Sequence, residues 1–108
     1  MDPVYKIFRA EEWALFEAAG ETAGAPIDHA DGFIHLSSAT QVAETAARHF
    51  AGEDGLMLLA IAAEDLTWEP SRGGALFPHL YRMLRAADVL WAKPLPRRDG
   101  GHVFDGLV

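Results

Sequence analysis

The sequence contains no cysteine, which excludes disulfides, thiolate metal sites and a cysteine nucleophile. It also lacks any apolar run near the roughly 20 residues that a membrane-spanning helix needs. The longest run, Leu56–Ala63, has the length of a buried strand. The first residues, Met1 to Lys6, have neither the basic start nor the apolar stretch of a signal peptide. We therefore expect a cytoplasmic protein that does not contact membranes.

Positive charge is scarce and unevenly distributed. Nine Lys and Arg stand against sixteen Asp and Glu, for a net charge of −7. Residues 1–70 contain three of the basic and thirteen of the acidic residues, and residues 71–108 contain the rest. Phosphate backbones are bound by many clustered Lys and Arg, so broad nucleic-acid binding is disfavoured. A local positive patch for a small anionic molecule remains compatible with this composition, although scattered surface charge is the simpler interpretation.

Half of the 108 residues are apolar, which is typical of a single globular domain spanning residues 1–108. Hydrophobic periodicity and turn residues predict its elements. Strands are predicted at Val4–Arg9, Phe33–Leu36, Leu56–Ala63, Leu66–Glu69, His79–Leu84 and Val89–Ala92, helices at Glu11–Ala19 and Ala39–Phe50, loops at 21–30 and 70–78, and a hairpin turn at 97–101 leading into 102–104. About six strands and two helices predict an α+β domain with a mostly antiparallel sheet. The sequence does not predict an oligomeric state.

The first group of candidate site residues lies where the strand at 33–36 meets the helix that follows it. His35 stands in a short apolar strand, and an imidazole there needs a polar partner. Ser37 is two residues further on and would share its face. Ser38 and Gln41 have the spacing of a capping box, which would put a helix N-terminus, a favourable place for anions, beside His35. The alternative is structural, with a satisfied core histidine and two capping residues.

The second group follows the strand at 66–69. Arg72 precedes a pair of glycines between Pro70 and Pro78, which suits a loop whose backbone approaches a ligand while the guanidinium contacts an anion. His79 follows, and Tyr81 would lie on its face in a strand, with Glu69 nearby. In the alternative interpretation this is a surface loop, with Arg72 paired to Glu69 and Tyr81 in the core.

Two other site chemistries are disfavoured. Asp28, His29, Asp31 and His35 are close in sequence, but they match no familiar metal-binding spacing such as H-E-x-x-H. We therefore predict no metal site. A Ser-His-Asp hydrolase would need a G-x-S-x-G elbow or an equivalent, and the sequence has none.

Three motifs resemble a known family. The runs GFIHLSSATQVAETAARHFAG, WEPSRGGALFPHLYRML and VLWAKPL are similar to the uncharacterised bacterial family called domain of unknown function 952. That family is distantly similar to the ADP-ribosyltransferase-like superfamily of split β-sheet domains that bind NAD in a cleft. The resemblance implies that His35-Leu36-Ser37 holds a ribose, as the superfamily's early-strand histidine does, and that NAD is a candidate cofactor. The late catalytic glutamate of the superfamily has no clear match, and Tyr81 is only a candidate for its aromatic platform.

Together these residues predict a polar cleft for an anionic nucleotide- or NAD-like ligand. The resemblance implies an enzyme of ADP-ribosyltransferase type or, because His35, Arg72 and His79 resemble the phosphate-binding set of its RNA 2′-phosphotransferase branch, of phosphotransferase type. We expect His35 to position a ribose or phosphate, Arg72 to stabilise charge and His79 to act as an acid or base. Ser37, Ser38, Gln41, Glu69 and Tyr81 are the candidate ligand-binding residues. The alternative is a non-catalytic module that binds a small ligand or a protein.

Overall fold

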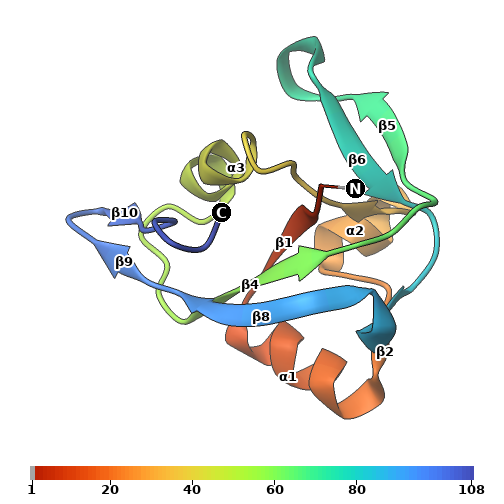
Figure 1. Ribbon diagram of the computed structural model, residues 1–108, viewed down its shortest axis with the longest axis horizontal. Helices are drawn as coiled ribbons and strands as arrows, with labels where there is room; N and C mark the ends of the chain where they lie inside the picture. The colour runs from red at the N-terminus through yellow and green to blue at the C-terminus, as the bar shows by residue number, and fades with distance from the viewer. Residues whose placement is uncertain (1) are drawn as a thin grey trace.

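The computed structural model describes residues 2–108, apart from the side chain of Arg72, and forms three α-helices and several short antiparallel sheets (Figure 1). Within that range the elements in chain order are β1 (Val4–Phe8), α1 (Ala10–Ala19), β2 (Glu21–Thr22), α2 (Pro26–Asp31), β3 (Ile34–His35), α3 (Val42–His49), β4 (Leu56–Ile61), β5 (Thr67–Pro70), the 3-10 turn η1 (Arg72–Gly74), β6 (Leu76–Leu80), β7 (Leu84–Arg85), the 3-10 turn η2 (Ala86–Asp88), β8 (Val89–Leu95), β9 (Arg97–Arg98) and β10 (Gly101–His102). The α+β class is confirmed. The predicted two helices and about six strands are too few, because residues 2–108 contain a third helix and ten strands, which divide among several antiparallel sheets.

The first sheet has the order β1-β4-β8, and both pairings are antiparallel. β4 confirms the predicted central strand, and Leu58, Leu59 and Ile61 within it are fully buried because both faces of the sheet are covered. β8 runs past the predicted end at Ala92 to Leu95. Pro94 does not stop it, since β8 is an edge strand and proline is tolerated where no ladder bond needs its N–H.

The second sheet has the order β3-β6-β5 and includes the β5–β6 hairpin, which projects at the top of Figure 1. The predicted loop over 70–78 is wrong at both ends, because Pro70 pairs with Leu76 and Pro78 pairs with Trp68 inside the ladder. Only the tip at 71–75 turns the chain. The restricted φ of proline is compatible with extended backbone, and the Pro78 carbonyl still accepts the N–H of Leu36 over 3.1 Å.

The strand predicted at 79–84 is interrupted. β6 ends at Leu80, and Leu84 begins β7, which pairs with β2. Arg82 accounts for the bend between them, because its guanidinium donates to both Asp65 and Asp88 and holds the chain in a turn.

The predicted loop over 21–30 is also wrong, because it contains β2 and most of α2. Pro26 takes the first helical position, which suits its fixed φ. Asp28 caps the helix, since its Oδ2 accepts the N–H of Ala25 over 2.7 Å. Gly32 ends it with a left-handed φ of 81°. A helix this short has no periodic pattern that the sequence could display. The helix at 11–19 was predicted correctly, as α1.

Helix α3 is shorter than the predicted 39–50. The carbonyl of Ser38 accepts the N–H groups of both Gln41 and Val42, so the chain turns before the helix begins. Half of the predicted capping box forms, because Gln41 Oε1 accepts the Ser38 N–H over 3.0 Å. The Ser38 hydroxyl lies by the hydroxyl of Thr40 instead of capping the helix.

The predicted hairpin after residue 96 is confirmed by the β9–β10 pair. Asp99 and Gly100 form its turn with φ values of 52° and 82°, the left-handed pair that a two-residue hairpin favours.

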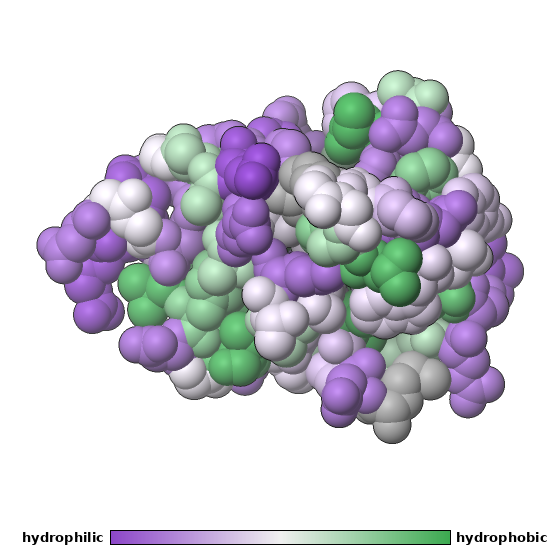
Figure 2. Space-filling model, turned by 90° about the horizontal axis from the view of Figure 1, so that it is seen from above, coloured by the Kyte–Doolittle hydropathy of each residue, from purple (hydrophilic) through white to green (hydrophobic). Residues whose placement is uncertain are grey.

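Two hydrophobic clusters cover the first sheet. One joins Phe8 and Phe16 to the inner side of β3 and β6, and the other joins Tyr5 and Leu56 to Val42 and Ala46 of α3. Phe16 is buried, whereas Trp13 and Phe50 are only partly buried. Seen from above, the surface is hydrophilic at the end with the β9–β10 hairpin, and its hydrophobic side chains lie in separate patches (Figure 2). In the part of the chain that the structure describes, no helix has the length and apolar character needed to cross a membrane.

Candidate functional site

The two three-stranded sheets meet at one bridge. Tyr5 of β1 and Ser37 exchange main-chain hydrogen bonds, 2.7 Å from the Tyr5 N–H to the Ser37 carbonyl and 3.0 Å in the other direction. In an antiparallel ladder the next such pair lies two residues along each strand, which here is Ile7 with His35. That pair does not form, and the sheets split at this point.

The main chain of His35 bonds instead to two side chains in the split. Its N–H donates to Asp28 Oδ1 over 3.0 Å, and its carbonyl accepts from the Lys6 ammonium, also over 3.0 Å. Lys6 and Asp28 form a buried ion pair with each other, 2.7 Å long, and are only 7% and 1% exposed. This pair supplies the hydrogen bonds that the missing strand pairing would have given.

Burial and pairing act in opposite directions on these two charges. Burial lowers the pKa of Lys6 below its usual value, and the attraction of Asp28 offsets only part of that shift. Burial also opposes the ionisation of Asp28. The Lys6 charge and the hydrogen bonds from Lys6 and His35 outweigh it and hold the pKa of Asp28 below its usual value.

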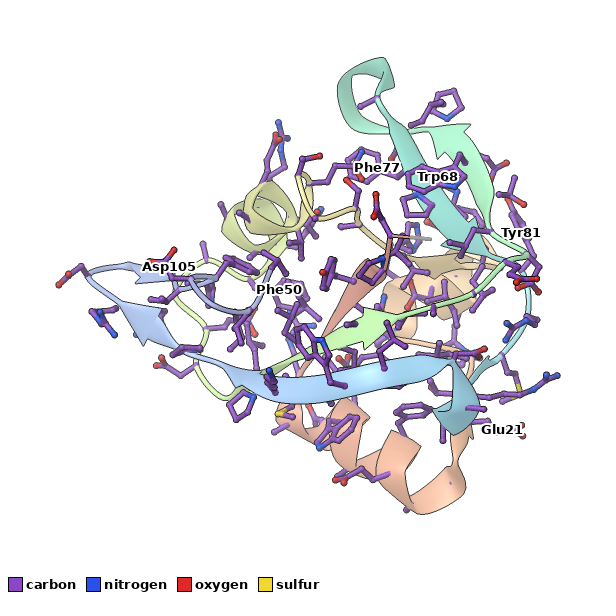
Figure 3. The ribbon with its side chains drawn as sticks, in the orientation of Figure 1. Glu21, Phe50, Trp68, Phe77, Tyr81 and Asp105 are labelled. Carbon is purple, nitrogen blue, oxygen red and sulfur yellow. The ribbon has the colours of Figure 1, made fainter. Side chains whose placement is uncertain are left out.

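A cavity of about 580 Å³ occupies the split, a volume within the usual range for small-ligand sites. β1, α2, β3, α3 and the β5–β6 hairpin all contribute to its walls. Five lining side chains can carry positive charge, against the single carboxylate of Asp31; they are Lys6, Arg9, His35, His49 and His79. Two aromatic rings, those of Phe77 and Phe50, form part of the cavity wall. Figure 3 labels Phe77 on the hairpin and Phe50 after α3.

His79 of β6 lies directly opposite His35 of β3, and the two ring centroids are 5.5 Å apart. His79 is only 4% exposed, and its Nδ1 lies 2.8 Å from Glu69 Oε1. The hydroxyl of Tyr81 donates to the same oxygen over 2.5 Å. The hydrogen bonds from Tyr81 and His79 lower the pKa of Glu69. An ionised carboxylate only accepts, so the Nδ1 of His79 carries the proton. No partner of its Nε2 is found among the described residues.

His35 is held differently. Its Nδ1 lies 2.6 Å from Asp28 and its Nε2 lies 2.9 Å from Asp31, and its side chain is 31% exposed. An ionised Asp28 only accepts, so the Nδ1 of His35 carries a proton. Asp31 places a second carboxylate beside the Nε2 edge of the ring at the wall of the cavity.

The structure brings several of the predicted site residues together. His35, Ser37 and His79 line the same cavity, and Glu69 and Tyr81 lie next to His79. Tyr81 is exposed, so the alternative that buries it in the core is wrong. The side chain of Arg72 lies outside the described part of the structure. Its neighbour Ser71 lines the cavity.

Ser38 and Gln41 lie apart from these residues. Ser38 lines a second hollow of about 620 Å³ together with Trp68. Gln41 donates to the main-chain oxygen of Leu76 over 2.7 Å and so ties the start of α3 to the hairpin. Both residues are held by structural hydrogen bonds, as the alternative interpretation expected.

Lys6, Asp28 and Phe33 are the site residues that the sequence did not identify. The ring of Phe33 stacks on His79 at 4.2 Å and also lies by His35 and Tyr81, so it fixes both imidazoles. A lysine inside an apolar strand was the one available signal, because a buried ammonium needs an acidic partner. Over residues 2–108 no cluster of three His, Asp or Glu side chains could hold a metal ion, counting only those that the structure describes.

The chain matches one protein family and resembles one protein whose structure has been solved. The family model described as "Protein of unknown function (DUF952)" matches residues 7–92, which include all three histidines that line the cavity. The crystal structure of protein CC0527 from Caulobacter crescentus is 46% identical, with 95% of each chain covered and a TM-score of 0.88. Its solution NMR structure, also 46% identical, covers 99% of this chain and 97% of that one with a TM-score of 0.87. No curated protein matches the chain.

Proposed function

Since the chain belongs to the DUF952 family, whose description assigns no activity, we propose a function from the site itself. The protein is an enzyme that binds a small anionic ligand of the nucleotide or NAD type in the split between β1 and β3. His79 transfers a proton to or from that ligand. Its class is that of an ADP-ribosyltransferase or a phosphotransferase.

The environment of His79 is the observation that carries the proposal. Glu69 fixes the ring with the proton on Nδ1, and this leaves the lone pair of Nε2 available. The ring is almost fully buried and lines the cavity. A neutral imidazole oriented by a carboxylate is a common general base, and such groups contribute about 10² to 10⁴ in rate.

The charge of the cavity wall supports an anionic ligand. The protein as a whole carries −7, yet the lining has five side chains that can be cationic and one carboxylate. Lys6 and Arg9 are already paired with Asp28 and Glu53. We assign to His35 the positioning of a phosphate or a ribose, because its ring lines the cavity with the hydroxyl of Ser37 close by. We assign Arg72 the stabilisation of charge that develops on the ligand.

The arrangement of the sheets supports NAD as the candidate ligand. Two three-stranded sheets are joined at one bridge and then diverge around a cavity, which suits the split-sheet architecture of the ADP-ribosyltransferase-like proteins. This step rests on an analogy of fold. Glu69 does not replace the late glutamate of that superfamily, because it is occupied by His79 and Tyr81.

The alternative, a non-catalytic binding module, is favoured by one observation. The Nδ1 and Nε2 of His35 lie 2.6 Å from Asp28 and 2.9 Å from Asp31, so two carboxylates compete with a ligand for this ring. In that case the cavity would bind its ligand without changing it.

A ligand screen with histidine variants tests the proposal. Thermal shift against NAD, AMP and inorganic phosphate should give a stabilisation of about 2.7 kcal/mol at a hundredfold excess over the Kd. His79→Gln should retain most of the binding but lose turnover of the ligand by at least about 10²-fold. His29→Gln is the matched control, because His29 is exposed on α2 and does not line the cavity.

Binding by none of these ligands would contradict the proposed anionic site. Turnover that is equal in wild type and His79→Gln would contradict the catalytic role. Binding without any turnover in the wild type would favour the alternative module.

A further inference from the structure

The edge of β1 carries a pair of main-chain groups that face the split. All five residues of β1 stand in register with β4, but the N–H and C=O of Tyr5 point the other way and bond to Ser37. The main-chain hydrogen bonds to β4 therefore come from the alternate residues, Lys6 and Phe8 among them. Because N–H and C=O directions alternate along a strand, those of Ile7 also point away from β4 and into the split. Ile7 itself lines the cavity.

These groups of Ile7 are unpaired. Neither its N–H nor its carbonyl has a hydrogen-bond partner in the described part of the protein, although the residue is only 5% exposed. The positions on either side are satisfied. Tyr5 bonds to Ser37, and the N–H of Arg9 donates to Glu12 over 2.8 Å. Buried main-chain groups without a partner are rare in folded proteins, so this open pair is a feature to be filled by something that enters the cavity.

We infer that Ile7 is the recognition site for an amide edge on the ligand, either a carboxamide or the lactam edge of a nucleobase. The N–H of Ile7 needs an acceptor, and its carbonyl needs a donor. An amide group supplies one of each in a single plane. A carboxylate offers only acceptors and would leave the carbonyl of Ile7 unpaired.

The length of the free edge of β1 favours a small planar group over a peptide strand as the ligand. Since Tyr5 and Arg9 are already bonded, the free edge is one residue long. A peptide added to an edge strand would need several successive pairs. A planar amide on a ring requires only this one, and Phe50, Phe77 and Tyr5 supply the apolar wall for the ring.

The inference deepens the proposed function and rests on it for the identity of the whole ligand. It adds a specificity for the uncharged end of a nucleotide- or NAD-like molecule, while His35 and His79 would contact the polar part. The Lys6–Asp28 pair makes this specificity available, because it keeps His35 from closing the ladder onto Ile7.

Amide NMR of the whole protein with benzamide and benzoate tests this. In the free protein the Ile7 amide hydrogen should exchange faster than those of Lys6 and Phe8, which are bonded to β4. Benzamide should move the Ile7 amide resonance downfield and slow its exchange. Benzoate, which has the same shape without the donor, should have a clearly smaller effect.

Equal responses to benzamide and benzoate would overturn the inference, as would an Ile7 amide that is already as protected as that of Lys6 in the free protein. So would a bound water that benzamide does not displace. The two proposals can fail separately. A response of Ile7 to benzamide without binding of NAD, AMP or phosphate contradicts only the proposed function. Binding of NAD, whose nicotinamide carries a carboxamide, that leaves the Ile7 amide unchanged contradicts only the amide site.

Discussion

Lys6 and Asp28 form a buried ion pair, 2.7 Å long, between two strands that would otherwise pair. The pair holds both main-chain groups of His35 and thereby fixes the place where β3 leaves β1. Asp28 also accepts a hydrogen bond from the Nδ1 of His35 and caps α2. One carboxylate therefore connects the helix, the split and the histidine that faces the cavity.

Asp28→Asn should strongly destabilise the fold. It leaves the Lys6 ammonium buried without a counter-charge, and breaking a buried pair in this way costs about 3–5 kcal/mol. Urea unfolding measures the loss. Asp54→Asn is the matched control, because its ion pair with Arg97 is exposed and should matter little. Equal unfolding midpoints for the two variants would show that the pair does not hold the split.

The stability that depends on Asp28 should disappear in acid. Its pKa is lower in the folded protein than the usual 3.8 of the unfolded chain, so between those two values the folded state binds fewer protons. The contribution is complete above the unfolded pKa and is lost as the pH falls through the folded pKa. The difference in unfolding free energy between wild type and Asp28→Asn, measured from neutral pH to below pH 3.8, should therefore shrink. A constant difference would contradict this assignment.

Core truncations should rank by burial. Phe8 is fully buried against Phe16, and Phe8→Ala should cost about 3–5 kcal/mol. Phe50 is partly buried and lies under the guanidinium of Arg9 at 4.7 Å. Phe50→Ala should therefore cost less, about 2 kcal/mol. Denaturant unfolding of both variants measures the two losses of stability. A larger loss for Phe50→Ala would show that the cluster around Phe50 contributes more to stability than the cluster around Phe8.

Arg72→Ala should abolish binding of the anionic ligand, and Arg72→Lys should restore little, since a forked planar contact is not replaced by a point charge. Calorimetry with AMP measures both variants. Arg98→Ala provides the control, because Arg98 is exposed on the distant β9–β10 hairpin. AMP binding that is the same in all three variants would remove Arg72 from the site.

The sequence predicted those elements whose patterns are long and local. β4 is apolar on both faces and α1 ends at a glycine, and both were placed correctly. Helix α2 was missed because its stability comes from one proline, one cap and a tertiary ion pair. Pro78 was misread as a boundary because proline often ends a strand, whereas here the ladder continues through it.

Within the site, the sequence predicted the residues that are unusual for their surroundings. His35 was identified because an imidazole in an apolar strand needs a partner, and His79 because it follows the Arg72 loop on the same face as Tyr81; both line the cavity. Their actual partners could not be predicted, since Asp28 and Glu69 reach them only through helix packing and strand register. Ser38 and Gln41 were included because a capping box resembles an anion site, but here hydrogen bonds to the turn and the hairpin occupy them.

The central claim is that His79 contacts a ligand in the split through its Nε2. Imidazole ¹⁵N NMR, recorded during titration with AMP and with NAD, tests it most directly. We predict a free-state spectrum with the His79 proton on Nδ1 and a change in the Nε2 resonance on addition of ligand, while exposed His29 stays unchanged. A His79 resonance that does not respond while the ligand binds, or a proton found on Nε2 in the free protein, would contradict the account.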